Sequence, residues 1–325
     1  MVEPDFPAVE SAARRLHGIA VRTPLIAQPA LDKATGRQVF LKPEILQLTG
    51  SFKFRGAYNR LSVLSDADRR AGVIAWSSGN HAQGIAAAAS MLGIRARIVM
   101  PEDAPAIKLQ NTRALGAEII TYDRYRQSRE ELAYGLAKRE GGVIVPSFDD
   151  PHIIAGQGTV GLECFHDLAQ RGVALDALLV CCGGGGLTAG CALAAEALSR
   201  GTDLFTVEPV GYDDYARSLA AGQIESADTS QQSICDALLT PCPGELTFNI
   251  NRQRVKAGLT VSEEEVRTAV AYAFRVLKLV VEPGGAVALA ALLHSKLDKS
   301  YQRVGVVVSG GNVDPALFAE IVQPT

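Results

Sequence analysis

The sequence predicts an α/β fold in which parallel sheets carry helices on both faces. Short β-rich runs alternate with Ala-, Leu- and Arg-rich stretches of helical spacing through most of the chain, which is the pattern of repeated β-α units. The run 304–308 is continuously apolar, as expected of a strand buried on both faces. At 325 residues, the chain is long enough for one large α/β domain or two moderate ones.

The individual elements follow in order along the chain. Helical spacing predicts helices at 53–61, 82–92 and 187–198. Turn-like composition near 66–72 and in the loop 146–151 marks two boundaries. We therefore predict a large domain formed by 1–71 and 150–325, with a smaller α/β domain of residues 72–149 inserted. The predicted strands are 38–41, 72–75, 96–100, 117–121, 143–145, 177–180, 204–207 and 303–308.

Composition narrows the function classes. Hydrophobic residues make up 47% and charged residues 21% of the chain, and the net charge is −3, which is typical of a soluble globular protein. This balance argues against nucleic acid or an anionic membrane surface as a partner, since both attract basic patches. No apolar run reaches the ~18–20 residues of a membrane span. The N-terminus carries no signal-peptide pattern and the six cysteines form no metal-binding spacing, so we expect a cytoplasmic protein with reduced cysteines.

The first motif that could carry chemistry surrounds Lys53, in the segment SFKFRG. Lys53 follows a Gly-Ser turn, begins a predicted helix and has a phenylalanine on each side. In an apolar pocket the pKa of a lysine falls, and its amine becomes a nucleophile toward an aldehyde. Taken alone, the motif favours the simpler interpretation of an exposed lysine in a first helical turn.

The second motif, Ser77-Ser78-Gly79-Asn80-His81, lies between a predicted strand and a predicted helix. Two hydroxyls, an amide and free backbone N–H groups at a helix N-terminus can bind a carboxylate. An ordinary helix start, capped by Asn80 or Ser78, explains the same residues equally well.

The third motif is the glycine run 183–186, again between a strand and a helix. Four glycines allow the backbone to wrap an anion at a helix N-terminus, which favours a phosphate cup. A rival interpretation is a nicotinamide oxidoreductase. Gly184, Gly186 and Ala189 fit the dinucleotide fingerprint, and Glu208 follows at the spacing of a ribose-binding acid. That interpretation leaves Lys53 and the Ser77–His81 loop unexplained.

Two further segments are ambiguous by themselves. Glu208 and Asp214 flank a turn and could bind a hard cation together with a backbone carbonyl, or form a solvated acidic turn. Ser309, in a Gly-rich segment after an apolar strand, could bond a heterocyclic nitrogen or cap a turn.

Together, the motifs SFKFRGA, SSGNHAQG, IAGQGT, CGGGGL and SGGNVD resemble the fold-type II (tryptophan-synthase-β-like) enzymes that depend on pyridoxal 5′-phosphate (PLP). Within that family the chain is most similar to the threonine/serine dehydratases and serine racemases. The motifs occur in the order of the family between about residues 22 and 314. The resemblance implies a large PLP-binding domain with a smaller inserted domain.

The resemblance also implies roles for single residues. Lys53 would be the Schiff-base lysine and then the proton carrier, Phe52 would flank the pyridine ring, and Asn80 would bond the PLP 3′-hydroxyl. Ser309 would lie at the pyridine nitrogen, where a neutral partner favours β-elimination over transamination. The phosphate would be held by Gly183, Gly184, Gly185, Gly186 and the backbone of Leu187.

For the substrate, the resemblance implies that Ser77, Ser78 and His81 grip the carboxylate and that Ser78 serves as acid/base on the face opposite Lys53. Arg129 resembles an arginine of the racemases that reaches the substrate carboxylate. The loop PSFDD, by contrast, resembles the dehydratases.

The racemase-like branch also implies a cation site. Glu208, Asp214 and the carbonyl of Tyr212 would bind Mg²⁺ or Ca²⁺, although that branch usually has a small residue at position 212.

We therefore expect an ammonia-lyase that converts threonine or serine to a 2-oxo acid and ammonia. Serine racemase and 3-hydroxyaspartate ammonia-lyase are alternatives on the same scaffold, and the oxidoreductase is a remote one. A non-enzymatic amino-acid-binding protein would not need Lys53. The chain ends soon after Asp314, so the resemblance further implies a catabolic enzyme without a regulatory domain. We also expect a homodimer or a higher homo-oligomer.

Overall fold

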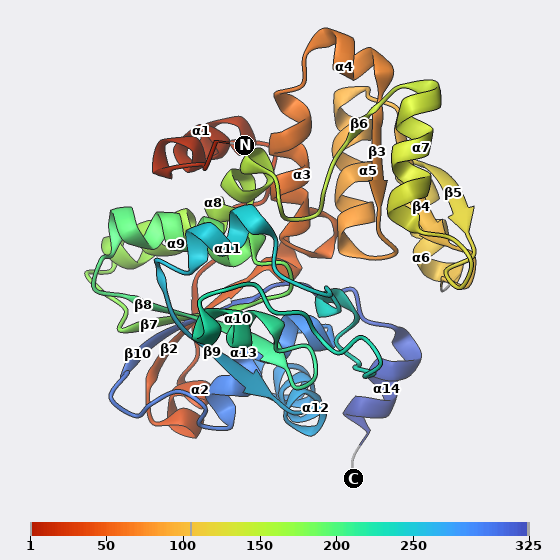
Figure 1. Cartoon of the computed structure of the whole chain (residues 1–325). Coiled ribbons are helices and arrows are strands. Elements are labelled where there is room, and N and C mark those ends of the chain that lie inside the picture. The colour runs from red at the N-terminus through yellow and green to blue at the C-terminus, as the bar shows by residue number, and fades with distance from the viewer. Residues whose placement is uncertain (1, 105, 324–325) are drawn as a thin grey trace.

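The computed structural model describes residues 2–104 and 106–323, and within them the chain forms two sheets (Figure 1). The larger sheet has six strands in the order β1 (Ile26–Ala27), β2 (Gln38–Pro43), β10 (Arg303–Val308), β7 (Ala177–Cys181), β8 (Asp203–Pro209) and β9 (Val255–Val261). The smaller sheet has four, in the order β5 (Glu118–Tyr122), β4 (Ala96–Pro101), β3 (Val73–Trp76) and β6 (Val143–Ile144).

The predicted α/β class is confirmed, and the parallel arrangement holds with one exception. Every described strand pair is parallel apart from β1 and β2, which pair antiparallel at the edge of the larger sheet. All eight predicted strands are present, with ends shifted by at most two residues. The strands β1 and β9 were not predicted.

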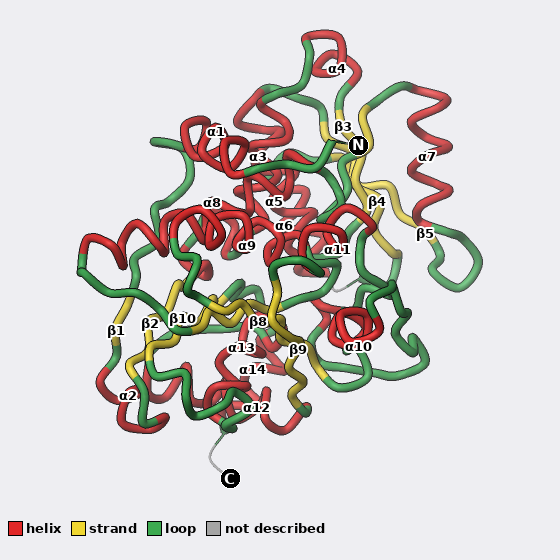
Figure 2. The backbone as a smooth tube through the Cα atoms, turned by 60° about the vertical axis from the view of Figure 1, so that its left-hand side comes forward, coloured by secondary structure: helices red, strands yellow, loops and turns green. Residues whose placement is uncertain are grey.

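Helices cover both faces of the larger sheet. Figure 2 shows α8 and α9 on one side and α12, α13 and α14 on the other. Local sequence explains the start of α8. Asp150 accepts from the backbone N–H groups of His152 and Ile153, and Pro151 lies in the first turn. The helices are α1 (Phe6–Leu16), α2 (Pro29–Thr35), α3 (Lys53–Ser62), α4 (Asp66–Ala71), α5 (Asn80–Leu92), α6 (Ala106–Ala114), α7 (Arg129–Glu140), α8 (Pro151–Gln170), α9 (Gly186–Leu198), α10 (Asp214–Ala221), α11 (Glu245–Asn251), α12 (Glu263–Tyr272), α13 (Pro283–Leu293) and α14 (Pro315–Val322).

Helix α3 connects the two sheets. All four strands of the smaller sheet fall within residues 72–149, the predicted small domain. Phe54, Ala57 and Leu61 of α3 nevertheless belong to the apolar core of that sheet, although they precede it in sequence. The position of α3 therefore decides where Lys53, its first residue, lies relative to both sheets.

The glycines of the motif IAGQGT allow α8 to approach its neighbours closely. A Cβ atom at Gly156 would lie 2.6 Å from the carbonyl oxygen of Arg55 in α3, and one at Gly158 would lie 2.8 Å from that of Gly190 in α9. Both distances are too short for any side chain, so α8 packs directly on the backbones of α3 and α9.

A buried ionic network fixes the start of α3. The guanidinium of Arg55 donates at 2.7 Å to Glu44, which follows β2, and at 2.7 Å to Glu163 of α8. Lys42 of β2 joins the network through a 2.6 Å bond to Glu163. Burial alone would lower the pKa of Arg55, but the two carboxylates raise it above its usual value. The network contains matched charges and is closed off from water.

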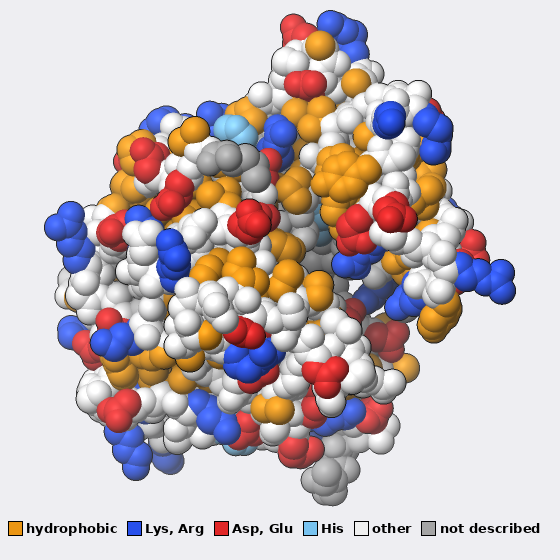
Figure 3. All heavy atoms as spheres, viewed as in Figure 1, with side chains coloured by type: hydrophobic (Ala, Val, Ile, Leu, Met, Phe, Trp, Pro, Cys, Tyr) orange, Lys and Arg blue, Asp and Glu red, His pale blue; other side chains and the backbone are white. Residues whose placement is uncertain are grey.

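No helix among the described residues is long and apolar enough to cross a membrane. Figure 3 shows acidic and basic side chains interspersed over the viewed face.

We predict that Arg55→Met lowers the free energy of unfolding by about 3–5 kcal/mol, because it leaves the buried carboxylate of Glu44 without a positively charged partner. Urea unfolding followed by circular dichroism measures this. The matched control is Arg95→Met, which breaks an exposed pair with Glu118 and should cost about 0–1 kcal/mol. Equal losses in the two variants would contradict a structural role for the network.

Candidate active site

Lys53 lies where the loop before α3 meets the loop after β10. The turn before it contains Thr49 and Gly50, both with positive φ. The backbone N–H of Phe52 donates to the carbonyl of Ser309 at 3.1 Å, and Ser51 forms an isolated antiparallel bridge with Gly310. Lys53 and Ser309, which are far apart in sequence, are thereby brought to one place.

The amine of Lys53 lies in surroundings that favour its neutral form. Its Nζ donates to the carbonyl of Ser147 at 2.9 Å and lies 5.1 Å from the centre of the Phe52 ring. Burial lowers the pKa of Lys53 to about 8, although the neighbouring Cys181 and Glu282 act in the opposite direction. The neutral amine is the nucleophilic form, so the site suits attack on an aldehyde. The alternative of an exposed first-turn lysine is not what the structure shows.

The glycine run forms a cup between β7 and α9. A Cβ atom at Gly184 would lie 2.4 Å from the Phe148 ring, and one at Gly185, where φ is +89°, would lie 2.4 Å from the Tyr215 ring. Among the described residues, no acceptor pairs with the backbone amides of 183–187, Leu187 included. These amides surround the N-terminus of the 13-residue helix α9 and suit a phosphate. The cup and Lys53 together therefore fit PLP.

The rival dinucleotide interpretation loses its ribose-binding acid. The carboxylate of Glu208 turns toward α10 and accepts from the backbone N–H groups of Tyr215 at 3.0 Å and Ala216 at 2.8 Å. It is fully buried, so it is not placed to bond the hydroxyls of a ribose.

The Ser77–His81 loop precedes α5 in a form different from an ordinary capped start. Gly79 is the N-cap residue and no side chain caps the helix, so neither Asn80 nor Ser78 serves as the cap. Asn80 instead donates to Glu282 at 2.6 Å and accepts from Asn312 at 2.6 Å. Its carboxamide is thereby committed to a network with the larger sheet.

His81 is held as a neutral ring. Its Nε2 lies 3.0 Å from the carbonyl of Val145, which can only accept, so Nε2 carries the proton. Burial, together with the positive charge of Lys53, lowers the pKa of His81 to about 3. His81 therefore supplies no positive charge for a carboxylate.

Positive charge near the loop comes from two arginines. A small cavity of about 60 Å³ at the carboxyl ends of β3, β4 and β5 brings together Ser77, Ser78 and Arg129 and is also lined by Arg124 and Tyr122. Arg124 pairs with Asp103 at 2.8 Å and Arg129 with Glu130 at 2.8 Å, and both side chains remain half-exposed. Two guanidinium groups beside two hydroxyls can bind an anion at this place.

Glu208 and Asp214 form a pair of buried carboxyl groups. Burial and the charge of Asp214 raise the pKa of Glu208, and burial raises that of Asp214 to about 7. The Oδ2 atom of Asp214 is buried without a partner. Among the described residues no group of three or more acidic, His or Cys side chains forms a metal centre. The unpartnered oxygen of Asp214, beside a second buried carboxyl group, is the kind of atom that a hard cation would satisfy.

Several site residues were not found from the sequence. Glu282 begins α13 and bonds Asn80. In the PSFDD loop, Ser147 accepts from Lys53, and Asp149 caps α11 by accepting from the N–H groups of Leu246 and Thr247. The loop composition indicated a turn, but not which helix start each acid would reach.

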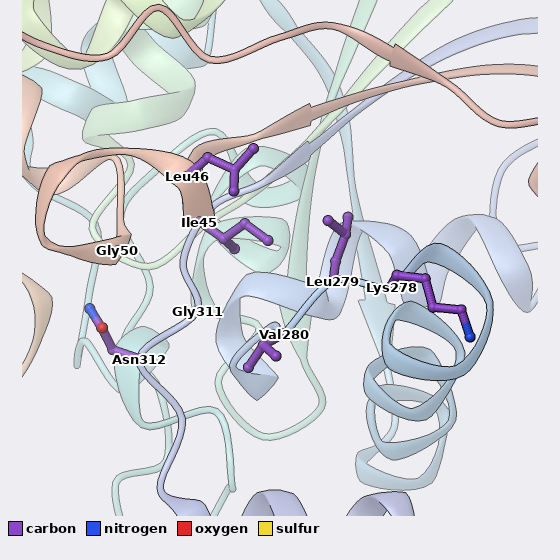
Figure 4. A pocket seen from close by; sticks show the side chains of 8 residues that line it. All are labelled: Ile45, Leu46, Gly50, Lys278, Leu279, Val280, Gly311 and Asn312. Atoms are coloured by element: carbon purple, nitrogen blue, oxygen red, sulfur yellow. The ribbon is translucent and has the colours of Figure 1, made fainter.

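A larger pocket of about 350 Å³ lies next to the loop before α3. It is lined by Ile45, Leu46, Gly50, Lys278, Leu279, Val280, Gly311 and Asn312 (Figure 4). Asn312, which reaches Asn80 on its other side, therefore separates this pocket from the loop of Asn80.

Comparison with known proteins gives a consistent result. Residues 18–310 match the family described as pyridoxal-phosphate dependent enzyme. The chain is 47% identical to an L-threo-3-hydroxyaspartate ammonia-lyase of Pseudomonas sp over 97% of each chain. It is 42% identical to a serine racemase of Schizosaccharomyces pombe over 99% of this chain and 98% of that one. A solved threonine deaminase from T.th. has a TM-score of 0.89 at 44% identity and covers 96% of this chain and 99% of its own.

We predict that the apo-protein captures PLP on Lys53 with a rate that rises between about pH 7 and 9 and then levels off. The lowered pKa of about 8 makes the amine neutral in that range, whereas an ordinary lysine would need a pH above roughly 10. Borohydride reduction at each pH, followed by mass spectrometry, measures the rate. Lys53→Ala should take up no label, and a rate that climbs until pH 10 or higher would contradict the assigned environment.

Proposed function

Because the chain belongs to the pyridoxal-phosphate dependent enzymes, in the group of ammonia-lyases and racemases, we propose that it is an ammonia-lyase whose best substrate is 3-hydroxyaspartate. The observation that carries the choice of substrate is the pair Arg124 and Arg129 in the cavity beside Ser77 and Ser78. Threonine and serine, expected from the sequence, become the comparison substrates.

PLP, when bound, supplies the electron sink that makes the Cα proton of an amino acid removable. The protein supplies the groups around it. Lys53 in its neutral form can take that proton as a general base, and its lowered pKa places it close to physiological pH. Ser309 offers an uncharged partner at the end of β10. The Gly183–Gly186 amides would hold its phosphate.

The two carboxylates of 3-hydroxyaspartate require two anion sites. The hydroxyls of Ser77 and Ser78, at the N-terminus of α5, suit the α-carboxylate. Arg124 and Arg129 lie in the same cavity and suit the second carboxylate, which threonine and serine do not have. The similarity to L-threo-3-hydroxyaspartate ammonia-lyases of Pseudomonas sp and Saccharomyces cerevisiae, at 47% and 42% identity, supports this choice.

Serine racemisation is a second candidate activity. It is favoured by the similarity to the S. pombe serine racemase and by the hydroxyl of Ser78, which could return a proton to the face opposite Lys53. The homo-oligomeric state and the cytoplasmic location expected from the sequence stay predictions.

We predict that kcat/KM for L-threo-3-hydroxyaspartate exceeds that for threonine and serine, and that Arg124→Met lowers it about 10- to 100-fold. A charged hydrogen bond is worth about 1.5–3 kcal/mol, which corresponds to that range. Serine turnover should change less than about 3-fold, because serine has no second carboxylate. The assay follows 2-oxo acid, ammonia and the product of inversion at Cα of each substrate.

The matched control is Arg126→Met, which removes a highly exposed arginine of the same loop. It should leave kcat/KM unchanged for all three substrates. Equal loss on serine and 3-hydroxyaspartate in Arg124→Met would contradict the second-carboxylate site. Release of D-serine from L-serine without 2-oxo acid would favour the racemase instead.

We further propose that Glu208, Asp214 and the Tyr212 carbonyl bind Mg²⁺ or Ca²⁺ away from Lys53. Chelation should lower the melting temperature of the holoenzyme and added Mg²⁺ should restore it, because a ligand that binds only the folded state stabilises it. Asp214→Ala should remove the response to both reagents, whereas Asp228→Ala, on an exposed loop, should retain it. A melting temperature indifferent to chelator and cation in the wild type would overturn the proposal.

A further inference from the structure

Glu282 is a buried acid that the chemistry described above does not use. It is the N-cap residue of α13, and its side chain is 3% exposed. Its backbone N–H donates to the carbonyl of Gly310, and a Cβ atom at Gly310 would lie only 2.1 Å from Glu282 Oε1. The glycine after Ser309 therefore leaves space for this carboxyl group.

A chain of side-chain hydrogen bonds leads from Glu282 through Asn80 to the loop before Lys53. Asn312 Nδ2 donates to the carbonyl of Thr49 at 2.8 Å and to Asn80 Oδ1 at 2.6 Å. Asn80 Nδ2 then donates to Glu282 Oε1 at 2.6 Å. Figure 4 shows Asn312 beside Gly50 at the outer end of this chain.

The two acceptors at the ends of this series of hydrogen bonds determine the orientation of both amide groups. A backbone carbonyl and an ionised carboxylate can only accept hydrogen bonds. Asn312 must therefore present its nitrogen to Thr49, and Asn80 must present its nitrogen to Glu282. No described residue accepts the second hydrogen of Asn80 Nδ2, so one N–H of this amide remains available.

We propose that Glu282 is a positioning residue that holds the Asn80 carboxamide with its nitrogen inward, so that the second N–H of Asn80 is fixed as a donor to the phenolic oxygen of PLP. The inference rests on the proposed function only in requiring that the chain binds PLP. It assigns to Glu282 no contact with the substrate.

The charges around Glu282 make its ionisation sensitive to pH near neutrality. Burial raises the pKa of Glu282 to about 7, and the charge of Asp236 acts in the same direction. The Asn80 hydrogen bond and the charges of Lys108 and Lys53 oppose this rise. Lys108 is itself paired with Asp236, and the thiol of Cys181, whose pKa burial raises to about 11, is uncharged.

The sign of the pH effect follows. Below about pH 7 Glu282 carries a proton and no longer only accepts, so the donor orientation of Asn80 is held from the Asn312 end alone. Above that pH it is ionised and only accepts, so the donor orientation of Asn80 is enforced. PLP affinity should therefore rise as the pH rises through about 7.

The experiment measures the dissociation constant of PLP for the apo-protein between pH 6 and 8.5, with the melting temperature of each apo variant as a check on folding. In the wild type, the affinity for PLP should rise about 3- to 10-fold as Glu282 ionises. This factor corresponds to the free energy of one hydrogen bond. Glu282→Gln should lose that rise and bind more weakly at pH 8. Glu264→Gln, an exposed carboxyl of α12, should behave as the wild type. Because the charge of Glu282 also raises the pKa of Lys53, the same series is measured in a Lys53→Ala background, which removes the contribution of Lys53.

A double-mutant cycle separates positioning from a direct effect of charge on the cofactor. In an Asn80→Ala background, Glu282→Gln should change PLP affinity by less than about 1.5-fold. A full-sized effect in that background, or an unchanged rise with pH in Glu282→Gln alone, would overturn the inference and leave the proposed function standing. Failure of every variant to bind PLP would overturn both.

Discussion

The guanidinium of Arg55 determines where the reactive lysine lies. It is two residues beyond Lys53 and is bound by Glu44 after β2 and by Glu163 of α8. The larger sheet and its covering helix thus both hold the first turn of α3. Desolvating two carboxylates and a guanidinium is costly, so such a network contributes more to a unique position than to net stability. The Lys53 amine lies at the end of a flexible side chain. A fixed backbone position limits the region that the amine can reach, so that it can lie near the glycine cup.

Burial explains most of the electrostatics of the site. It favours the neutral form of Lys53 and of His81 and raises the pKa of Glu282. A dry interior of this kind suits proton transfer, but it cannot hold an anionic substrate unaided. The positive charges of Arg124 and Arg129 lie at a half-exposed cavity instead. There they can be hydrated until a carboxylate replaces the water. The nucleophile and the cations are consequently kept in different dielectric surroundings.

The sequence allowed the α/β class and eight strands to be predicted, because runs of β-forming residues alternate with helical spacing, and because strands buried on both faces, such as β10, are apolar almost without interruption. The strand β9 was missed because its burial is partial and it contains a lysine and a glycine. Among the candidate site residues, four could be identified from the sequence because each belongs to a local motif: Lys53, Ser77, Ser78 and the glycine run 183–186. Glu282 and Arg124 could not. They contact partners 202 and 21 residues away, Asn80 and Asp103, and no local pattern reveals such contacts.

The division of the site between the two sheets accounts for the range of activities on this scaffold. The cup, Ser309 and Glu282 follow or cap elements of the larger sheet and its helices, whereas Ser77, Ser78, Arg124 and Arg129 follow strands of the smaller one. The hydrogen-bond chain through Asn80 and Asn312 joins the two halves. Substitutions at the end of β5 lie on the smaller sheet, apart from Lys53, the glycine cup and Ser309. A 3-hydroxyaspartate ammonia-lyase, a serine racemase and a threonine deaminase are among the proteins that this chain resembles, and the proposed function assigns the choice of substrate to the arginines at the end of β5.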